Sequence, residues 1–421
     1  MPDRRPFHVL VITLMLVATA ASGPAGAAVK RMFVTSASGN GDLSTWPQAG
    51  NSAGRAAGDK TCQNLAASAG LSNASGFRAW LSTDATDAFC HVAGFSGKRA
   101  SNCGQASLPN AGPWVRMDGK PFAHKLQSLT STTRIIFYPA MIAETGSPVP
   151  PSYVHTGTWE DGTTARPGGV AADCSDWTSS SLMEDHQIGE THGGSIWWNQ
   201  ASSIDCASDG RLLCFETGLG DDLPSFGRPG AFVFVSSALG TGNLGSWSEA
   251  QGHTGLAAGD AICQTLAAAA GYVAPASFRA WLSAGSTAAI DRLTIDGPFR
   301  RPGGVEIGAT KDWLVSGTPS DAALAADIEV DDLGIHNAYQ AFTGTTAPGQ
   351  PSGFDCNGWT SASAGDVATF GFGNVATGSW TEAGTRSCDK ISHIYCFTNV
   401  VGLFADGFES GNTSAWAAKA P

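Results

Sequence analysis

The chain has 421 residues, 42% of them hydrophobic, which is enough for two or three domains that each bury a core. Only 14% of the residues are charged, and the net charge of −12 argues against nucleic acid, polyanions and anionic membrane surfaces as partners. The 53 glycines follow no period, which excludes a collagen-like chain and favours loop-rich domains.

The first 28 residues have the pattern of an export signal. Arg4 and Arg5 precede a short apolar run at 9–20, and Ala25-Gly26-Ala27 supplies the small residues of a cleavage site. The run is too short to span a bilayer, and no later stretch is long and apolar enough to do so. We therefore expect a secreted or cell-surface protein, with the periplasm as an alternative, and a mature chain that starts near Ala28.

Ten cysteines in an exported chain favour a disulfide framework, and a metal site is the alternative interpretation. No two cysteines are separated by two residues, which excludes a zinc ribbon.

An internal repeat organises the chain. Residues 32–82 match residues 233–283 without a gap, with 27 identities in 51 positions. The match resumes downstream with an offset of 182 residues, where Cys174 corresponds to Cys356. The first copy is longer, and its insertion carries the two unmatched cysteines, Cys90 and Cys103. We predict domains at 29–217 and 231–400, a linker at 218–230 and a tail at 401–421.

Each copy has the same expected elements in chain order. A strand at 32–36 precedes an amphipathic helix that begins at the predicted N-cap Asp59 and ends at Gly70. A second strand follows at 77–81, and a final strand at 212–215. The second copy repeats these elements, with Asp260 as its N-cap, so we predict the α+β class.

These residues resemble a known family. A helix that carries a Cys, then Phe-Arg-Ala-Trp-Leu-Ser at 77–82, then Cys-x-x-Trp-Thr at 174–178, and two Cys eight residues apart before a final strand are similar to endostatin and to bacterial endostatin-like surface proteins. Both are variants of the C-type-lectin-like fold, so the resemblance implies two tandem domains of that fold. It also implies nested disulfides, whereas spacing alone leaves three connectivities for each set of four cysteines. The implied pairs are Cys62–Cys214, Cys174–Cys206, Cys263–Cys396 and Cys356–Cys388, and Cys90–Cys103 is expected to close a local loop.

Three tryptophans are the candidate ligand-binding residues, because exposed aromatic rings stack on sugars. Trp198 and Trp380 stand where sugar-binding lectins have a Trp-Asn-Asp triplet, but the calcium-ligating Asp is missing, so we interpret both as core residues. Trp197 has no equivalent in the second copy and lies beside Trp198, so one of this pair is expected to be exposed.

Two clusters could hold a metal ion. The four acids Asp327, Glu329, Asp331 and Asp332 have the oxygen ligands that calcium prefers, but no known ligand spacing, so we favour a solvated acidic loop. The first copy alone has a second cluster, which we interpret as a polar loop rather than a zinc site: Glu184, Asp185, His186, Glu190 and His192.

No motif for catalysis is present, so we expect neither an enzyme nor a cofactor. The leading hypothesis is a non-catalytic adhesion protein that recognises an extracellular matrix protein or a polysaccharide, as the resemblance implies. Calcium-independent carbohydrate binding and an exported hydrolase are the alternatives. The unrepeated segment at 404–416 is either a sorting or surface-attachment segment, or an extra strand or disordered end.

Overall fold

The computed structural model describes residues 29–132, 135–223 and 229–402. The expected export signal, the C-terminal segment and part of the expected linker lie outside these ranges. Within them, helices and strands are mixed and five disulfides are present, which confirms a disulfide-rich α+β protein. No helix in the described ranges combines the length and apolar character needed to cross a bilayer.

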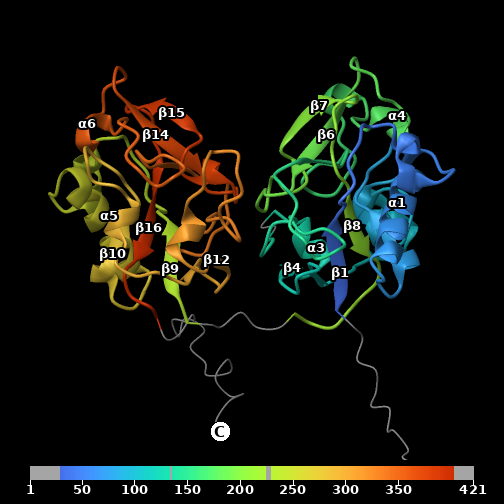
Figure 1. Ribbon diagram of the computed structural model, residues 1–421, viewed down its shortest axis with the longest axis horizontal. Helices are drawn as coiled ribbons and strands as arrows, with labels where there is room; N and C mark the ends of the chain where they lie inside the picture. The colour runs from blue at the N-terminus through green and yellow to red at the C-terminus, as the bar shows by residue number, and fades with distance from the viewer. Residues whose placement is uncertain (1–28, 133–134, 224–228, 403–421) are drawn as a thin grey trace, which may run out of the picture.

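The first copy is built on a five-stranded sheet and a three-stranded sheet (Figure 1). The five-stranded sheet has the order β2 (Phe77–Ala79), β8 (Leu213–Glu216), β1 (Lys30–Val34), β3 (Trp114–Val115) and β4 (Pro121–Ala123). The three-stranded sheet consists of β5 (Tyr153–His155), β6 (Asp185–Glu190) and β7 (Ser202–Asp205).

The second copy joins the equivalent strands into one larger sheet. Its strand order is β12 (Glu306–Gly308), β11 (Phe299–Arg300), β9 (Ala231–Val235), β16 (His393–Thr398), β13 (Gln340–Phe342), β14 (Val367–Phe372) and β15 (Gly384–Ser387). Strand β10 (Phe278–Ala280) also pairs with β16 and is the eighth strand of this sheet, outside the linear order given above. The central antiparallel pairs β1–β8 and β9–β16 are equivalent in the two copies.

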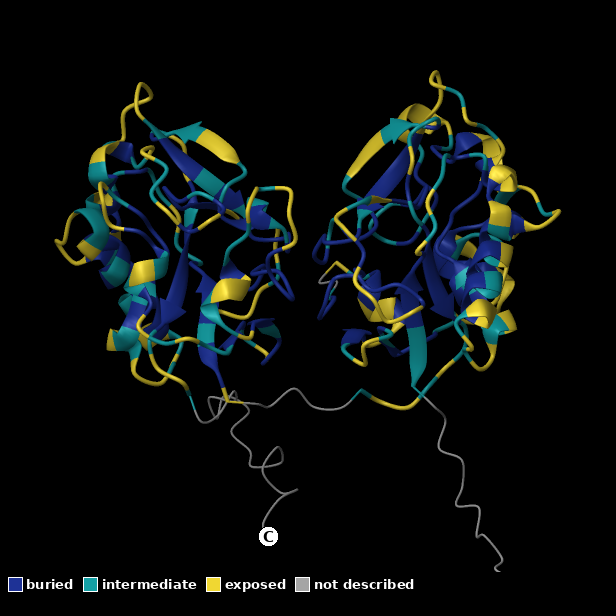
Figure 2. Ribbon diagram, viewed as in Figure 1, coloured by how far each residue is buried: buried dark blue, intermediate teal, exposed yellow. Residues whose placement is uncertain are grey.

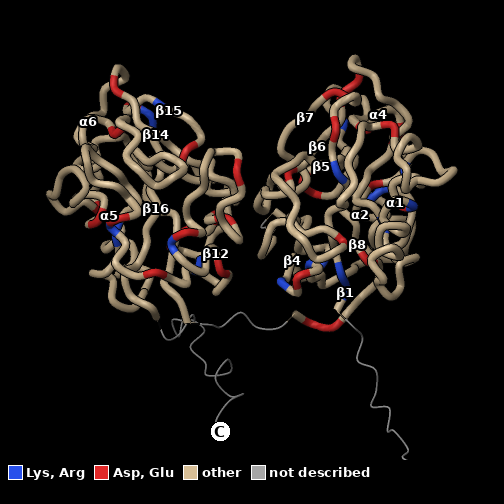
Figure 3. The backbone as a smooth tube through the Cα atoms, in the orientation of Figure 1, with Lys and Arg blue, Asp and Glu red and all other residues tan. Residues whose placement is uncertain are grey.

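One long helix in each copy packs against this sheet, and both helices lie on the outer flanks of the molecule (Figure 1). They are α1 (Gly54–Ser68) and α5 (Gly255–Ala269), and the short helices are α2 (Ala88–Val92), α3 (Leu126–Leu129), α4 (Cys174–Trp177) and α6 (Cys356–Trp359). Figure 2 shows buried residues filling the centre of each copy. In Figure 3 the basic residues are few and scattered among the acidic ones.

The prediction that Asp59 and Asp260 cap these helices is wrong. Helix α1 begins five residues earlier, at Gly54, and Asp59 lies within it. The Asp59 carboxylate instead accepts a hydrogen bond from the Ala79 amide of β2 at 2.9 Å. It also contacts Arg78 at 3.9 Å, so this side chain fastens the helix to the neighbouring strand. Asp260 repeats both contacts in the second copy.

The disulfides are nested within each copy and join the same pairs that the resemblance implies. Cys62–Cys214 and Cys263–Cys396 connect the long helix to the last strand, and each closes a loop of more than 130 residues. Cys174–Cys206 and Cys356–Cys388 each span 32 residues inside that loop. Cys90–Cys103 closes a 13-residue loop in the insertion of the first copy.

Candidate functional site

Of the three tryptophans proposed as sugar platforms, two are fully buried and the third, Trp197, is half-buried. Trp198 and Trp380 are fully buried, which confirms their interpretation as core residues. Trp197 lies in a turn rather than on a strand, and its ring packs at 5.2 Å from Phe372 of the second copy. The alternation expected for a strand therefore does not apply to this pair, and Trp197 belongs to the contact between the copies.

The acidic run at 327–332 is buried, so its interpretation as a solvated loop is wrong. Asp327 pairs with the buried guanidinium of Arg301. Glu329 accepts hydrogen bonds from the amide and hydroxyl of Ser195, which belongs to the first copy, and contacts His336 Nδ1 at 2.9 Å. Burial raises the pKa of Glu329, but the His336 hydrogen bond and the Arg301 charge outweigh it and lower the pKa below its ordinary value.

The other two acids of this run are also occupied by donors of the protein. Asp331 accepts a hydrogen bond from the Tyr339 hydroxyl at 2.7 Å. Asp332 accepts two hydrogen bonds from Ser237, at 2.6 and 2.9 Å. Carboxylate oxygens that already accept protein hydrogen bonds are poorly placed to ligate calcium, which applies to Asp331 and Asp332.

The second predicted cluster is divided along a strand, so its interpretation as a polar loop is wrong as well. Asp185 to Glu190 form β6, in which His186 and Glu190 are four residues apart and therefore lie about 13 Å from each other along the strand. His186 is buried inside the first copy, whereas Glu190 and His192 line a cavity at its surface. The structure therefore does not bring the five side chains together around one point.

His186 forms a buried pair with His155 beside the inner disulfide. His155 Nδ1 and His186 Nε2 are 2.6 Å apart, and His155 Nε2 lies 2.8 Å from the Gly39 carbonyl. Because a carbonyl only accepts, His155 Nε2 carries a proton, and His186 Nε2 is the donor within the pair. Both rings are then neutral, as expected from burial, which lowers the pKa of His155 to about 4 and that of His186 to about 3.

A ligand atom of His186 and the sulfurs of Cys174 and Cys206 lie within 4.8 Å of one another. The two sulfurs are joined in a disulfide, so they are not available as thiolate ligands in this oxidised state. The second copy has Phe342 and Ala368 where the first has the two histidines, next to an equivalent disulfide.

The contact between the two copies is nearly two-fold symmetric. Gly193 forms an antiparallel bridge with Val375, its own equivalent under the 182-residue offset. The flanking hydrogen bonds are reciprocal: Gly194 donates to the Asn374 carbonyl at 2.7 Å, and Ala376 donates to the His192 carbonyl at 2.9 Å. A pseudo-two-fold axis therefore passes through this bridge, as in an isologous dimer interface.

One side of this axis, which we call the closed side, is filled by side chains. The Trp197 ring packs on Phe372 there, and Glu329 bonds to Ser195 between the copies. Arg301 is buried in the same region and donates to the carbonyls of Ile136 at 2.6 Å and of Phe137 at 3.1 Å. These contacts join the two copies through side chains that are mostly buried, including Arg301, Glu329 and Ser195.

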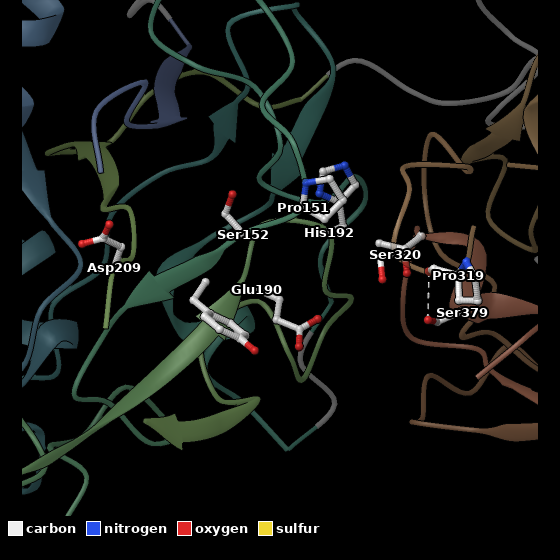
Figure 4. A pocket seen from close by; sticks show the side chains of 10 residues that line it. Pro151, Ser152, Glu190, His192, Asp209, Pro319, Ser320 and Ser379 are labelled. Carbon is white, nitrogen blue, oxygen red and sulfur yellow. Dashed lines mark hydrogen bonds between the residues drawn. The ribbon is translucent and has the colours of Figure 1, made fainter. Parts of the chain in front are cut away.

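The opposite side, which we call the cleft, is open because the equivalent residues are smaller or differ in chemistry. The symmetry partners of Trp197 and Phe372 are Ser379 and Glu190. These two residues line a cavity of about 500 Å³ between the copies. Figure 4 shows that residues of the first copy face residues of the second across it: Pro151, Ser152, Glu190 and His192 on one side, and Pro319, Ser320 and Ser379 on the other.

A second lobe of the cleft has a volume of about 450 Å³ and shares His192 with the first. It is the symmetry counterpart of the buried Arg301 cluster. The equivalent bridges Val34–Ala143 and Val235–Asp331 align Pro139 and Met141 with Asp327 and Glu329. Met141 and Trp313 line this lobe. Because the acids are replaced here by apolar residues, nothing equivalent to the Glu329 hydrogen bonds closes this side.

The cleft presents aromatic and polar groups to a ligand. Tyr153 in the first lobe and Trp313 in the second are 47% and 46% exposed. Burial alone raises the pKa of Glu190 above its ordinary value. Burial, followed by the charge of Arg116, lowers the pKa of His192 to about 4, so its imidazole is neutral at physiological pH.

Sequence reasoning did not find this cleft, because its lining residues come from distant segments of both copies. The one available signal was the repeat: Trp197 and Glu190 are aligned with Ser379 and Phe372, which are unlike them in size and polarity. That mismatch gains meaning only when the reciprocal contact at Gly193 places the two pairs on opposite sides of one axis.

No protein-family model matches the chain, and no curated protein matches it significantly. The function proposed below therefore rests on the sequence and on the geometry of the cleft.

Proposed function

We propose that the protein is an exported, non-catalytic binding protein with two tandem C-type-lectin-like domains of the endostatin type, and that it binds a polysaccharide in the cleft. The observation that carries this proposal is the two-lobed cleft itself, with an exposed aromatic ring in each lobe and hydroxyls and carboxylates between them. Sugar rings stack on aromatic side chains and exchange hydrogen bonds with such polar groups.

The arrangement of disulfides and strands supports the domain assignment. In each copy an early helix is cross-linked to the last strand, and a shorter cross-link lies inside that loop. The same arrangement twice in one chain agrees with the motif order that resembles endostatin. Five disulfides and the N-terminal signal pattern support export, because such bonds persist in oxidising compartments.

The shape and chemistry of the cleft favour a polysaccharide over a matrix protein as the ligand. Two neighbouring cavities that share His192 as a lining residue suit an extended chain. Specific protein partners require roughly 800 Å² of complementary surface on each side, with an apolar centre. The first lobe is instead lined mainly by small polar residues: Ser152, Ser320, Thr377 and Ser379.

The hydrolase alternative has one observation in its favour, because Glu190, whose pKa burial raises, and Asp209 both line the first lobe. No arrangement of a serine nucleophile in the described ranges supports it. Among the described residues of the contact between the copies, the hydroxyl of Ser195 bonds to Glu329 rather than to a histidine. His192 Nδ1 lies 3.0 Å from the hydroxyl of Thr191, its neighbour in the chain. Neither arrangement orients a nucleophile and a base toward the cleft.

A glycan and matrix-protein array with the full chain tests the proposal. We expect binding to polysaccharides that survives a chelator, and a loss of about fivefold or more in affinity for Tyr153→Ala, since sugar stacking is worth about 1–3 kcal/mol by analogy with base stacking. Phe354→Ala is the matched control, because Phe354 is also 47% exposed but does not line the cleft.

Binding to matrix proteins alone, or glycan binding that Tyr153→Ala and Phe354→Ala reduce equally, would contradict the proposal. Turnover of a bound glycan, detected as new reducing ends, would favour the hydrolase alternative instead.

A further inference from the structure

The first lobe of the cleft carries acidic groups at positions where the second copy has apolar residues. Glu190 and Asp209 line this lobe, and the 182-residue offset aligns them with Phe372 and Ile391. None of the ten described residues that line the lobe is a lysine or an arginine. The charge that the first lobe presents to a ligand is therefore negative.

The Glu190 carboxylate has no partner for its charge within the described part of the chain, where its side chain forms neither a hydrogen bond nor an ion pair. Two guanidinium groups near the lobe are bonded elsewhere: Arg211 donates to two backbone carbonyls, and Arg116 pairs with Asp118. A half-buried carboxylate without a donor is stabilised by a ligand that brings a donor or a positive charge.

An aromatic ring lies beside this carboxylate. Tyr153 of β5 is directly opposite Glu190 of β6 in the antiparallel pair, and the Cβ atoms of such residues are about 4.5–5.5 Å apart. A tyrosine ring attracts an ammonium group over its face, and a carboxylate accepts strong hydrogen bonds from the same group. The equivalent pair in the second copy is Gln340 and Phe372, so the ring and the acid occur together only on the side of the cleft.

His192 adds a polar atom that is left for a ligand. The residue is only 2% exposed and lines both lobes, and Figure 4 shows it on the same side of the cleft as Glu190. Its Nδ1 lies 3.0 Å from the Thr191 hydroxyl, whereas its Nε2 has no hydrogen-bond partner among the described residues. A buried polar atom without a protein partner at the wall of a cavity indicates that a ligand or water bonds to it there.

We infer that the first lobe binds an amino sugar whose free amino group is protonated, so that the ligand of the cleft is a cationic polysaccharide. This inference rests on the proposed function and narrows it to one class of glycan. The ammonium group lies beside Tyr153 and donates to Glu190, and the sugar hydroxyls bond to the serine and threonine side chains of the lobe. The net charge of −12 favours the approach of a cationic chain over an acidic one.

Calorimetric titration of the full chain with two oligosaccharides of equal length tests the inference: β-1,4-linked glucosamine and β-1,4-linked N-acetylglucosamine. Acetylation removes the positive charge and leaves the rings and the linkage unchanged. At neutral pH and low salt, we expect the oligomer with free amines to bind about tenfold or more tightly than the acetylated one, and high salt should reduce this preference.

Glu190→Gln should reduce the preference to about twofold or less, with little change in affinity for the acetylated oligomer, because it removes the charge and keeps the shape. The variant should melt no lower than the wild type, since the Glu190 carboxylate has no protein hydrogen bond to lose.

Glu249→Gln is the matched control, because Glu249 is another half-buried glutamate and lies in the 3₁₀ helix Ser248–Ala250, outside both lobes. It changes the net charge by the same amount, so it should keep the preference if the contact with Glu190 is local. This comparison separates a specific contact from the general attraction of a polycation to an acidic protein.

Equal affinities of the wild type for the two oligomers would overturn the inference, as would equal losses of preference in Glu190→Gln and Glu249→Gln. Binding to neutral or acidic glycans alone would also overturn it, but the proposed function would stand as long as Tyr153→Ala weakened that binding. Absence of binding to every glycan would overturn both.

Discussion

His155 and His186 occupy positions where the second domain has Phe342 and Ala368, and the histidines make the first domain sensitive to acid. Both rings are buried and neutral, with pKa values near 4 and 3 that lie below the ordinary value of 6.5. As the pH falls below 6.5, the unfolded chain takes up protons that the folded chain cannot accept. Stability is therefore fully present above pH 6.5 and is lost as the pH falls toward 4.

We predict that His155→Phe combined with His186→Ala abolishes most of this loss. A single histidine whose pKa falls from 6.5 to about 4 contributes roughly 3 kcal/mol of destabilisation by pH 4. Urea unfolding of the wild type and the double variant at pH 8 and pH 4.5 measures the difference. Asp173, whose pKa is raised, titrates in the same range with the opposite sign, so only the comparison between the two proteins is informative.

We expect the double variant to fold, because phenylalanine and alanine occupy the equivalent positions beside the equivalent disulfide of the second domain. A change in its pH dependence therefore reports on the histidine pair. A pH dependence that is unchanged in the double variant would show that other groups control acid stability.

At the scale of elements, β14 passes very close to the turn at Trp380. Among the described glycines, Gly371 of β14 is the one whose added Cβ would meet the nearest neighbouring atom. A Cβ at Gly371 would lie 1.8 Å from the Trp380 carbonyl oxygen, and Gly189 in β6 has the same relation to Trp198 at 2.2 Å. Backbone atoms cannot yield as a flexible side chain does, so strand and turn would have to separate.

We predict that Gly371→Ala destabilises the second domain by about 3 kcal/mol or more. Gly365→Ala is the control, because its nearest neighbour is the Ser363 hydroxyl at 3.5 Å, and we expect a change below about 1 kcal/mol. Denaturant titration of the two variants gives both values, and equal stabilities would show that the turn moves freely.

The Cys90–Cys103 disulfide stabilises the insertion between α2 and the following 3₁₀ helix (Arg99–Gly104). In the chain-entropy model, a loop of 13 residues gives a stabilisation of about 3 kcal/mol. We expect Cys90→Ala with Cys103→Ala to lower the stability of the first domain by about this amount and to leave the second domain unchanged. Differential scanning calorimetry should show a shift in one of two transitions, and equal shifts in both would contradict this assignment.

At the scale of the whole molecule, divergence between the copies explains why one side of the pseudo-two-fold axis is filled and the other is open. The double substitution Glu190→Phe and Ser379→Trp would place in the cleft the same aromatic pair that Trp197 and Phe372 form on the closed side. We predict that this variant loses glycan binding by more than about tenfold while its domains remain folded, because the new rings occupy the first lobe.

Trp197→Ala with Phe372→Ala is the opposite change. It should weaken the contact between the domains without changing the cleft residues, and separate calorimetric transitions for the two domains would reveal this. If the first variant retained full affinity for the glycan, the ligand would have to bind outside the first lobe.

The sequence alone determined the duplication, the α+β class and the positions of the long helices and of several strands. These properties depend on local periodicity and on the alignment of the chain with itself, which neighbouring residues encode. The resemblance to endostatin implied the nested cysteine pairs from motif order, and the burial of Trp198 and Trp380 was predicted because the calcium-ligating Asp of the lectin triplet is missing beside each of them.

Only the tertiary structure decided what each charged residue does. Aspartate is a residue type that favours the N-cap position, which is why Asp59 was predicted to begin the helix. In the folded protein its carboxylate instead accepts a hydrogen bond from the Ala79 amide of β2. The acids at 327–332 look solvent-exposed in the sequence. In the structure Ser195 bonds to Glu329 across the contact between the copies, and Arg301 pairs with Asp327 inside the second copy. Whether a carboxylate is paired, buried or left without a donor is set by groups that are distant in the chain, and the free energy of those contacts exists only once the chain has folded.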